Sequence, residues 1–185
     1  WKTYLGRPET DSYRNASMEL LSNALRVSRP EEALPVLEAC LALRRRHWSF
    51  DEECILGAQQ NLAACFSELD RHEEALGLER RIYARRVATL GVSHESTITA
   101  GYNLAVSLEN SRRFKEANLL TRDQLLPVAR QSLGADHEIT LQLNYNLAGV
   151  LLLQNPERTR GDLRWNPHRS GGGGRVFHLN TGDDL

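Results

Sequence analysis

A tripeptide that recurs at a fixed spacing constrains this sequence more than any other feature. Asn-Leu-Ala begins at Asn61, at Asn103 and at Asn146, so the two steps are 42 and 43 residues. A period of this size indicates supersecondary units that stack on one another, because a single unit cannot bury all of its apolar surface. The sequence therefore predicts a repeat array.

Two further markers keep the same period. Glu-Glu-Ala-Leu, or a close variant of it, recurs every 42 residues, starting at Glu31, Glu73 and Lys115. Leu-Gly-x-x-His-Glu-x-Thr starts at Leu90 and again 43 residues later at Leu133. The one extra residue of the third unit therefore lies between Ala117 and Leu133. Three independent markers on one period make a chance repeat implausible.

Each unit is predicted to contain two helices. In the second unit the first helix runs from about residue 52 to 69, and its apolar residues follow helical spacing at Leu56, Leu62, Ala63, Phe66 and Leu69. The second helix runs from about residue 72 to 90. Gly91 follows it at a position where a left-handed backbone conformation costs glycine little.

The array is expected to span residues 1–154, with units at approximately 9–48, 49–90 and 91–133 and a partial unit at 134–154. Helix breakers then become frequent, including Pro156, Pro167 and four glycines at 171–174. We predict that residues 155–185 are a disordered or low-complexity tail. The partial unit would leave an apolar face open near Leu143, Leu147 and Leu151.

Composition narrows the classes of partner. The chain is 41% hydrophobic and 25% charged with a net charge of −1, which is ordinary for a soluble globular protein. No overall basic excess favours nucleic acid or an anionic membrane surface, and no apolar run approaches the ~20 residues of a membrane span. Three cysteines in apolar helical contexts favour reduced, core-filling thiols, so we expect a cytoplasmic protein.

The quoted motifs resemble the kinesin-light-chain type of tetratricopeptide repeat, whose unit is longer than the usual ~34 residues. The resemblance covers about residues 18–153. It implies an all-α fold, a right-handed superhelical solenoid of antiparallel helix pairs (TPR-like, with units of about 42 residues). Two departures stand out: Asp70 and Arg112 replace turn glycines, and Pro127 predicts a kink or early break of its helix near Leu126.

The resemblance also implies where a partner binds. In such a solenoid the first helices line the concave groove, and the matching candidate residues here are Gln60, Asn61, Thr99, Tyr102, Asn103, Val106, Gln142, Tyr145 and Asn146. An Asn amide can pair with a peptide backbone in either direction, and Tyr gives rigid area with a polar tip. For the Asn residues a second interpretation stays open, that each bonds a neighbouring helix and fixes stacking.

Chemical motifs point away from catalysis. No phosphate-binding loop, nucleophile motif or zinc-ligand spacing is present, so we expect no enzyme activity, no catalytic residue, no metal and no cofactor. His94 and His137 stand at equivalent places one unit apart and are interpreted as helix-start residues. Seven arginines on second helices are interpreted as a solvated outer face rather than a basic ridge for an acidic partner: Arg44, Arg45, Arg46, Arg80, Arg81, Arg85 and Arg86.

The predicted function is a protein–protein interaction scaffold that binds a peptide or partner segment in the concave groove. The alternative is a regulatory repeat region of a larger enzyme or signalling protein. Nucleic acid and membrane are not expected as partners. Self-association through the uncapped C-terminal repeat is a further candidate contact.

Overall fold

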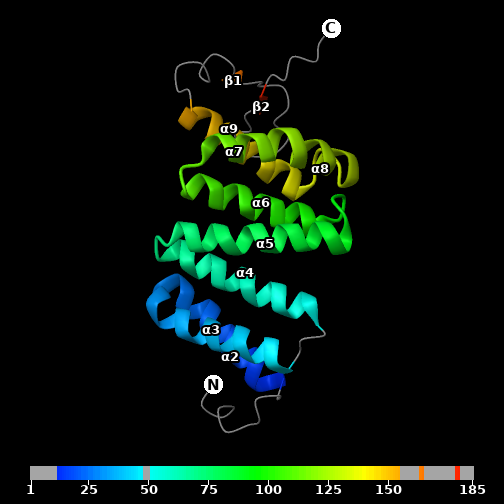
Figure 1. The fold of residues 1–185 in the computed structure, drawn as a ribbon. Coiled ribbons are helices and arrows are strands. Elements are labelled where there is room, and N and C mark those ends of the chain that lie inside the picture. The colour runs from blue at the N-terminus through cyan, green and yellow to red at the C-terminus, as the bar shows by residue number, and fades with distance from the viewer. Residues whose placement is uncertain (1–11, 48–50, 155–162, 165–177, 180–185) are drawn as a thin grey trace. The chain divides into compact units, whose positions relative to one another are not determined.

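The computed structural model describes residues 12–47, 51–154, 163–164 and 178–179 (Figure 1). The chain forms two compact units, residues 1–85 and 86–185, whose division falls inside one helix. The first contains α2 (Ser12–Ser28), α3 (Pro30–His47), α4 (Glu52–Glu68) and most of α5 (His72–Leu90). The second contains α6 (Glu95–Asn110), α7 (Phe114–Leu119), the π-helical η1 (Leu120–Leu125), α8 (Leu126–Ser132) and α9 (Glu138–Gln154). The predicted all-α fold of helix pairs is confirmed.

The core of the first unit lies where α3, α4 and α5 meet. One cluster of buried side chains joins Leu37 and Leu41 of α3 to Leu62 and Phe66 of α4 and Leu78 of α5. Small residues line the same cluster at Ala33, Ala58, Ala63 and Ala75. Because these alanines add no bulk at the crossing points, the helix backbones can approach closely and the larger side chains interdigitate around them.

The second unit is built around α9, which packs against α6, α7 and α8. Its buried face contains Leu143 and Val150, both with no exposed area, together with Leu147. The expectation of an open apolar face at Leu143 and Leu147 is therefore wrong. Among the α9 residues whose side chains the structure describes, Leu141 and Tyr145 are the exposed large apolar ones.

The turns between α4 and α5 and between α6 and α7 each contain a residue with a left-handed backbone conformation that is not glycine. Asp70 and Arg112 both have φ of 57°. In each turn the next amide reaches back five residues, from Arg71 to the Phe66 carbonyl at 2.9 Å and from Arg113 to the Leu108 carbonyl at 2.8 Å. These bonds satisfy carbonyls at the helix end and offset the cost of about 1–2 kcal/mol that a side chain incurs in this conformation.

The extra residue of the third unit is absorbed by a change of helix type. η1 is π-helical, and the Leu126 amide bonds the Thr121 carbonyl five residues back instead of the usual four. A π-helical segment accommodates the extra residue without ending the helical structure. Pro127 then falls in the first turn of α8, where its missing donor is tolerated. Of the predicted kink or early break near Leu126, the early break is wrong, since helical structure continues to Ser132. The kink remains a prediction.

Most of the predicted tail, residues 155–185, lies outside the described residues. Two short strands are described there, β1 (Leu163–Arg164) and β2 (His178–Leu179), which pair antiparallel. β2 lies against α9. The predicted bounds of the repeat units and of the tail remain predictions. Within the described residues, no helix is both long enough and apolar enough to cross a membrane.

Candidate protein-binding surface

The predicted groove residues all lie on first helices of the pairs. Gln60 and Asn61 are on α4 in the first unit. The other candidates lie in the second unit on α6, at Thr99, Tyr102, Asn103 and Val106, and on α9, at Gln142, Tyr145 and Asn146. Since α6 and α9 contact one another, the structure brings these two sets onto neighbouring helices.

Tyr145 is the most exposed of the candidates, with 83% of its area open to solvent. Leu141 lies one helical turn earlier and is 46% exposed, so the two side chains share a face of α9. Gln142 beside them donates to the Glu138 carboxylate at 3.1 Å. This part of α9 therefore presents an aromatic ring and an aliphatic side chain with an amide at their edge.

The candidates on α6 are partly buried. Thr99 donates its hydroxyl hydrogen to the Glu95 carbonyl of its own helix at 2.9 Å. Burial raises the pKa of the Tyr102 hydroxyl, and the Glu109 carboxyl nearby raises that pKa further. Tyr102, Asn103 and Val106 thus offer partial rather than full exposure to a ligand.

Asn146 is buried, with 8% of its area exposed. Its side-chain amide donates to Glu109 of α6, so it joins two first helices. Burial raises the pKa of Glu109 to about 7, and the hydrogen bond from Asn146 opposes that rise. The interpretation that an Asn of this motif fixes stacking is thereby supported at this position.

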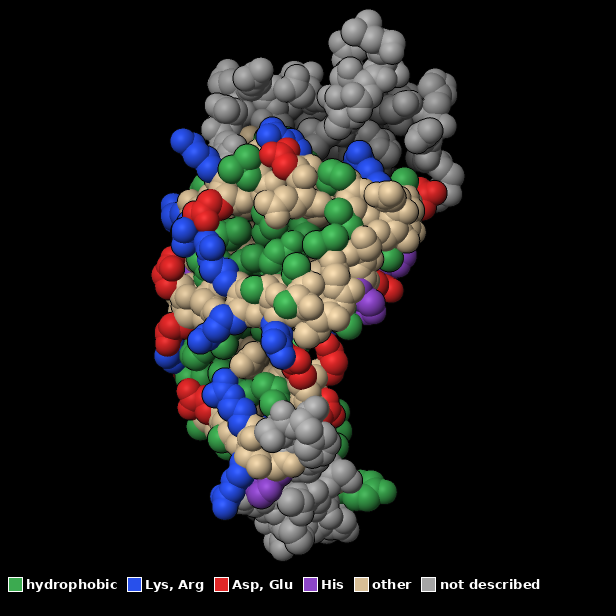
Figure 2. Space-filling view, turned by 45° about the vertical axis from the view of Figure 1, so that its right-hand side comes forward, with side chains coloured by type: hydrophobic (Ala, Val, Ile, Leu, Met, Phe, Trp, Pro, Cys, Tyr) green, Lys and Arg blue, Asp and Glu red, His purple; other side chains and the backbone are tan. Residues whose placement is uncertain are grey.

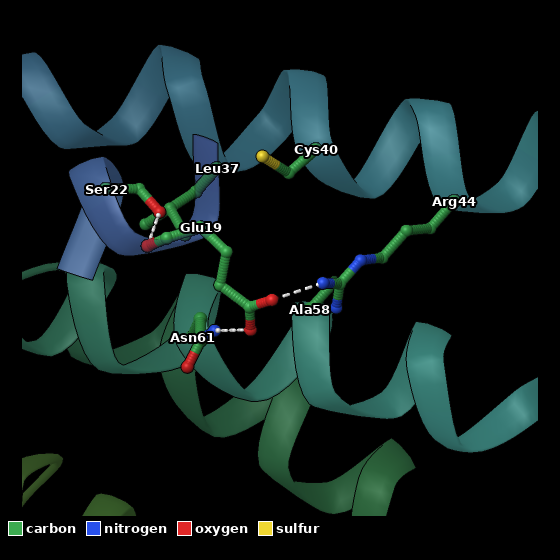
Figure 3. Close-up of a pocket in the computed structure, with 7 residues that line it drawn as sticks. All are labelled: Glu19, Ser22, Leu37, Cys40, Arg44, Ala58 and Asn61. Carbon is green, nitrogen blue, oxygen red and sulfur yellow. Dashed lines mark hydrogen bonds and ion pairs between the residues drawn. The ribbon is translucent and has the colours of Figure 1, made fainter. Parts of the chain in front are cut away.

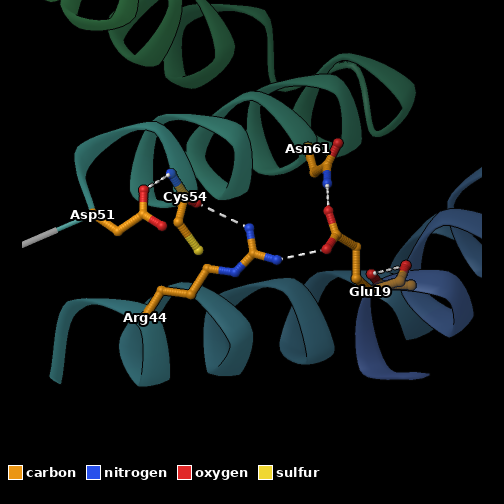
Figure 4. Close-up of polar contacts among 6 residues, drawn as sticks. Glu19, Arg44, Asp51, Cys54 and Asn61 are labelled. Atoms are coloured by element: carbon orange, nitrogen blue, oxygen red, sulfur yellow. Dashed lines mark hydrogen bonds and ion pairs between the residues drawn. The ribbon is translucent and has the colours of Figure 1, made fainter. Parts of the chain in front are cut away.

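Asn61 makes a comparable bond in the first unit. Its amide donates to Glu19 of α2 at 3.2 Å, and Arg44 of α3 donates to the other oxygen of that carboxylate at 2.5 Å (Figures 3 and 4). Arg44 also donates to the Cys54 carbonyl of α4 at 2.9 Å. One guanidinium therefore connects all three helices, and its side chain is only 13% exposed.

A small pocket lies beside this cluster, lined by Glu19, Ser22, Leu37, Cys40, Arg44, Ala58 and Asn61 (Figure 3). The space inside it is roughly enough for one water molecule. Burial raises the pKa of the Cys40 thiol, while Arg44 opposes that rise. The pocket suits a solvent molecule rather than an organic ligand.

The interpretation of all seven arginines as a solvated outer face is wrong for two of them. Arg44 is largely buried in the cluster, and Arg86 is 8% exposed. These two stand 42 residues apart, so they occupy one slot of the repeat. Of the exposed set, Arg85 forms a two-bond pair with Glu52. Figure 2 shows acidic and basic side chains lying next to one another on the surface.

Sequence reasoning missed Glu19 and Glu109 as acceptors for the Asn residues. A signal for Glu19 was present, since it stands 42 residues before Asn61 and so fills the same slot in the preceding unit. Residues at equivalent positions of successive repeats lie on neighbouring helices of the stack, so their side chains can form hydrogen bonds with each other. Glu109 lies six residues after Asn103 in the sequence and is not at the repeat position equivalent to Asn146, so the period does not predict it as a partner of Asn146.

The two equivalent histidines begin helices, as expected. The His94 ring accepts a hydrogen bond from the Ser96 amide at 3.2 Å, and the His137 ring accepts one from the Ile139 amide at 3.4 Å. Both contacts satisfy an amide of the first turn. Among the described residues, no group of three or more His, Cys, Asp or Glu side chains could hold a metal ion.

Comparison with known proteins gives matches in structure. No protein-family model matches the chain, and no curated protein matches it. A crystal structure of a Podosopora anserina putative kinesin light chain with nearly identical TPR-like repeats matches with a TM-score of 0.71 and 22% identity, over 86% of this chain and 76% of that one. A single-substitution variant of that protein matches with a TM-score of 0.72 over the same shares.

A third match is BtubC (BKLC) from P. vanneervenii, with a TM-score of 0.66 and 15% identity over 82% of this chain and 61% of that chain. At these identities the likeness shows the fold. The chain therefore has the TPR-like helix-pair fold of kinesin-light-chain-type repeats, which is the fold that its repeated motifs predict.

Proposed function

We propose that this protein is an interaction scaffold that binds a peptide or partner segment along its first helices, in the groove predicted from the repeat type. The observation that carries the proposal is Tyr145, which is 83% exposed on α9 and stands one turn from exposed Leu141. An exposed ring beside an exposed aliphatic side chain gives a binding partner apolar area to bury. The TPR-like fold supports a scaffold role in general.

The candidate residues divide into two roles under this proposal. Asn61 and Asn146 hold first helices together through Glu19 and Glu109, so they shape the surface. Tyr145 provides the anchor, and Gln142 at its edge offers an amide whose carbonyl oxygen can accept from a peptide N–H while its nitrogen bonds Glu138. Binding then depends on the exposed residues more than on the motif asparagines.

The same proposal includes a non-enzymatic, cytoplasmic protein that does not bind nucleic acid. The expectation that the protein does not bind nucleic acid is supported by several arginines that pair with carboxylates, as Arg71 does with Glu74 and Arg113 with Glu116. Paired guanidiniums are poorer phosphate ligands than a free basic stripe. The alternative, a regulatory repeat region of a larger enzyme, shares the binding surface and differs in what is attached to it.

Affinity capture with a matched pair of tyrosine variants tests the proposal. The parent, Tyr145→Ala and Tyr13→Ala would each be immobilised. Tyr13→Ala is the control, because Tyr13 is also largely exposed but lies in the other unit. Proteins retained by the parent and by Tyr13→Ala would then be purified, and their affinity for all three proteins would be measured by calorimetry. We expect at least tenfold weaker binding by Tyr145→Ala. Equal binding by the parent and Tyr145→Ala would contradict the assignment.

A further inference from the structure

The contact between α6 and α9 includes a carboxyl group that has no positively charged partner among the described residues. Glu109 is half-buried near the end of α6, and its hydrogen-bond donor is the side-chain amide of Asn146 on α9. Neither α6 nor α9 contains a lysine or an arginine. In the first unit Glu19 accepts from Arg44 as well as from an asparagine. The described donor to Glu109 is a neutral amide alone.

The other elements around α6 do not supply a charge to Glu109 either. The α6 helix contacts α7, η1, α8 and α9, and its Thr97 hydroxyl donates to the Arg86 carbonyl of α5. The pKa of Glu109 responds to burial and to the bond from Asn146. Tyr102, whose own pKa Glu109 raises, is neutral where a carboxyl titrates. The ionisable side chains that do not affect the pKa of Glu109 are those of Arg86 on α5, Lys115 and Glu116 on α7, Arg122 and Asp123 on η1, Arg130 on α8, and Glu138 and Tyr145 on α9.

The place of Glu109 on its helix also disfavours a negative charge. The α6 helix ends at Asn110, so Glu109 lies in its last turn. The C-terminal end of a helix carries a partial negative charge from its unpaired carbonyl groups, which destabilises an anion there. The other acids of these two helices, Glu95 and Glu138, lie in first turns, where the dipole favours the ionised form. Helix position therefore favours the protonated form at Glu109 and not at the other two.

Asn146 has an acceptor atom that a proton on Glu109 would satisfy. Its side-chain oxygen Oδ1 is buried and has no hydrogen-bond partner among the described residues, while its nitrogen Nδ2 donates to Glu109. Buried polar atoms without a partner are rare because they are costly. A protonated carboxyl has a hydroxyl donor beside its acceptor oxygen, so it can donate to an amide while it accepts from the same amide. Protonation of Glu109 thus supplies the donor that Oδ1 lacks.

We propose that Glu109 is a carboxylic acid in the folded protein at pH 6 and forms two hydrogen bonds with Asn146, and that loss of its proton releases α9 from α6. In the paired form the Glu109 hydroxyl donates to Asn146 Oδ1, and Asn146 Nδ2 donates to the other Glu109 oxygen. On deprotonation the proton passes to solvent, the first bond is lost, and a half-buried negative charge remains at the helix end.

The direction of the pH dependence follows from the burial of Glu109, which raises its pKa to about 7. This value lies above the ordinary 4.5. The contribution of the paired form is therefore fully present below about pH 4.5 and is lost as the pH rises through about 7. The inference concerns the docking of α9 and holds whether or not Tyr145 anchors a partner.

Carbon-13 NMR of the full chain, labelled at its glutamate side-chain carboxyls, tests the protonation state. We expect one carboxyl resonance of the parent to titrate with a midpoint near pH 7 and to be absent from Glu109→Gln. Glu138→Gln is the control, because Glu138 is an exposed acid on α9 itself, and it should retain that resonance. If every glutamate carboxyl of the parent titrates near the ordinary value of about 4.3, the proposal is overturned.

Hydrogen exchange followed by mass spectrometry at pH 6 and pH 8 tests the release of α9. After correction for the intrinsic pH dependence of exchange, protection of residues 138–151 should fall about fivefold in the parent and in Glu138→Gln. It should not fall in Glu109→Gln, whose amide reproduces both bonds at either pH. Equal falls in the parent and Glu109→Gln would overturn the proposal. So would an equal fall in α4, because the whole chain rather than α9 would then respond to pH.

Glu109→Met tests the two hydrogen bonds themselves, since methionine is similar in size to glutamine but can form neither of them. At pH 6 we expect α9 of Glu109→Met to be less protected from exchange than α9 of Glu109→Gln, by about fivefold. Equal protection in these two variants would show that the bonds with Asn146 do not hold α9, and would overturn the proposal.

Discussion

The two units join successive first helices with the same kind of bond in different electrostatic settings. In the first unit Asn61 of α4 donates to Glu19 of α2, and Arg44 donates to the same carboxylate. In the second unit Asn146 of α9 donates to Glu109 of α6. Burial raises the pKa of Glu109 to about 7, and the amide of Asn146 is the contact that opposes this rise.

At Glu109 the amide of Asn146 does not compensate the burial of the carboxyl. A guanidinium supplies charge as well as donors, so the Arg44–Glu19 contact is stronger than a hydrogen bond from a neutral amide. A neutral amide supplies one donor, and the carboxyl then takes up a proton more readily. The stability that the Glu19 contacts give the first unit should therefore depend on Arg44. The stability that the Glu109–Asn146 contact gives the second unit should depend on pH.

Replacement of Arg44 by methionine is expected to have the largest effect. It removes the charge opposite Glu19 and leaves the Cys54 carbonyl without this donor. We expect the free energy of unfolding to fall by about 2–3 kcal/mol, below the full cost for a wholly buried pair because Glu19 is partly exposed. Urea denaturation of both proteins measures the change.

The double variant Glu19→Met/Arg44→Met is the control for that measurement. It removes the carboxylate together with its partner, so it should recover part of the lost stability. A double variant less stable than Arg44→Met alone would show that Glu19 contributes through contacts other than this ion pair.

Glu109→Gln should have the next largest effect, and the effect should appear only at higher pH. The folded-state pKa of about 7 lies above the ordinary value of 4.5. Stability from this group is therefore fully present below about pH 4.5 and is lost as pH rises through about 7. We expect the variant to exceed the parent by about 1–2 kcal/mol at pH 8, after allowance for solvent screening at this partly exposed group.

The measurement is the difference in free energy of unfolding between Glu109→Gln and the parent from pH 4 to pH 8. It should grow from near zero, because glutamine is neutral throughout and keeps an acceptor for Asn146. Glu74→Gln serves as the comparison, since Arg71 lowers the pKa of that exposed carboxyl and its difference should not grow in the same direction. A flat profile for Glu109→Gln would contradict the assigned pKa.

Asn61→Ala should have the smallest of these effects. It removes one donor from Glu19, but the carboxylate retains its contact with Arg44. We expect a loss of about 1 kcal/mol in urea denaturation. A loss as large as that of Arg44→Met would mean that the amide, and not the guanidinium, is the main contact of this junction.

Much of the fold could be predicted because a period is a property of the whole chain. Three markers at steps of 42 or 43 residues place each helix pair. The early break expected at Pro127 was wrong for a local reason. One extra residue and one proline each disrupt an α-helix, but together they fit a π-helical segment with the proline in the following first turn.

The candidate surface was less predictable than the fold. A motif position gives the helix face of a residue but not its bonding partner, which comes from another helix. Asn61 and Asn146 thus share a motif position with a predicted groove role, yet both are bonded across helices. The burial of Arg44 was also missed, because a basic residue near a helix C-terminus is ordinarily solvated there.

The central claim is that the residues that anchor a partner are distinct from those that hold the helices together. The most direct test measures how Tyr145→Ala and Asn146→Ala bind a captured partner, together with the thermal unfolding of each variant. Tyr145 is open and Asn146 is buried although they are adjacent. We predict that Tyr145→Ala loses at least tenfold in affinity at an unchanged melting temperature, while Asn146→Ala melts earlier and binds normally when folded. Normal binding by Tyr145→Ala, with affinity lost only in folded Asn146→Ala, would contradict the account.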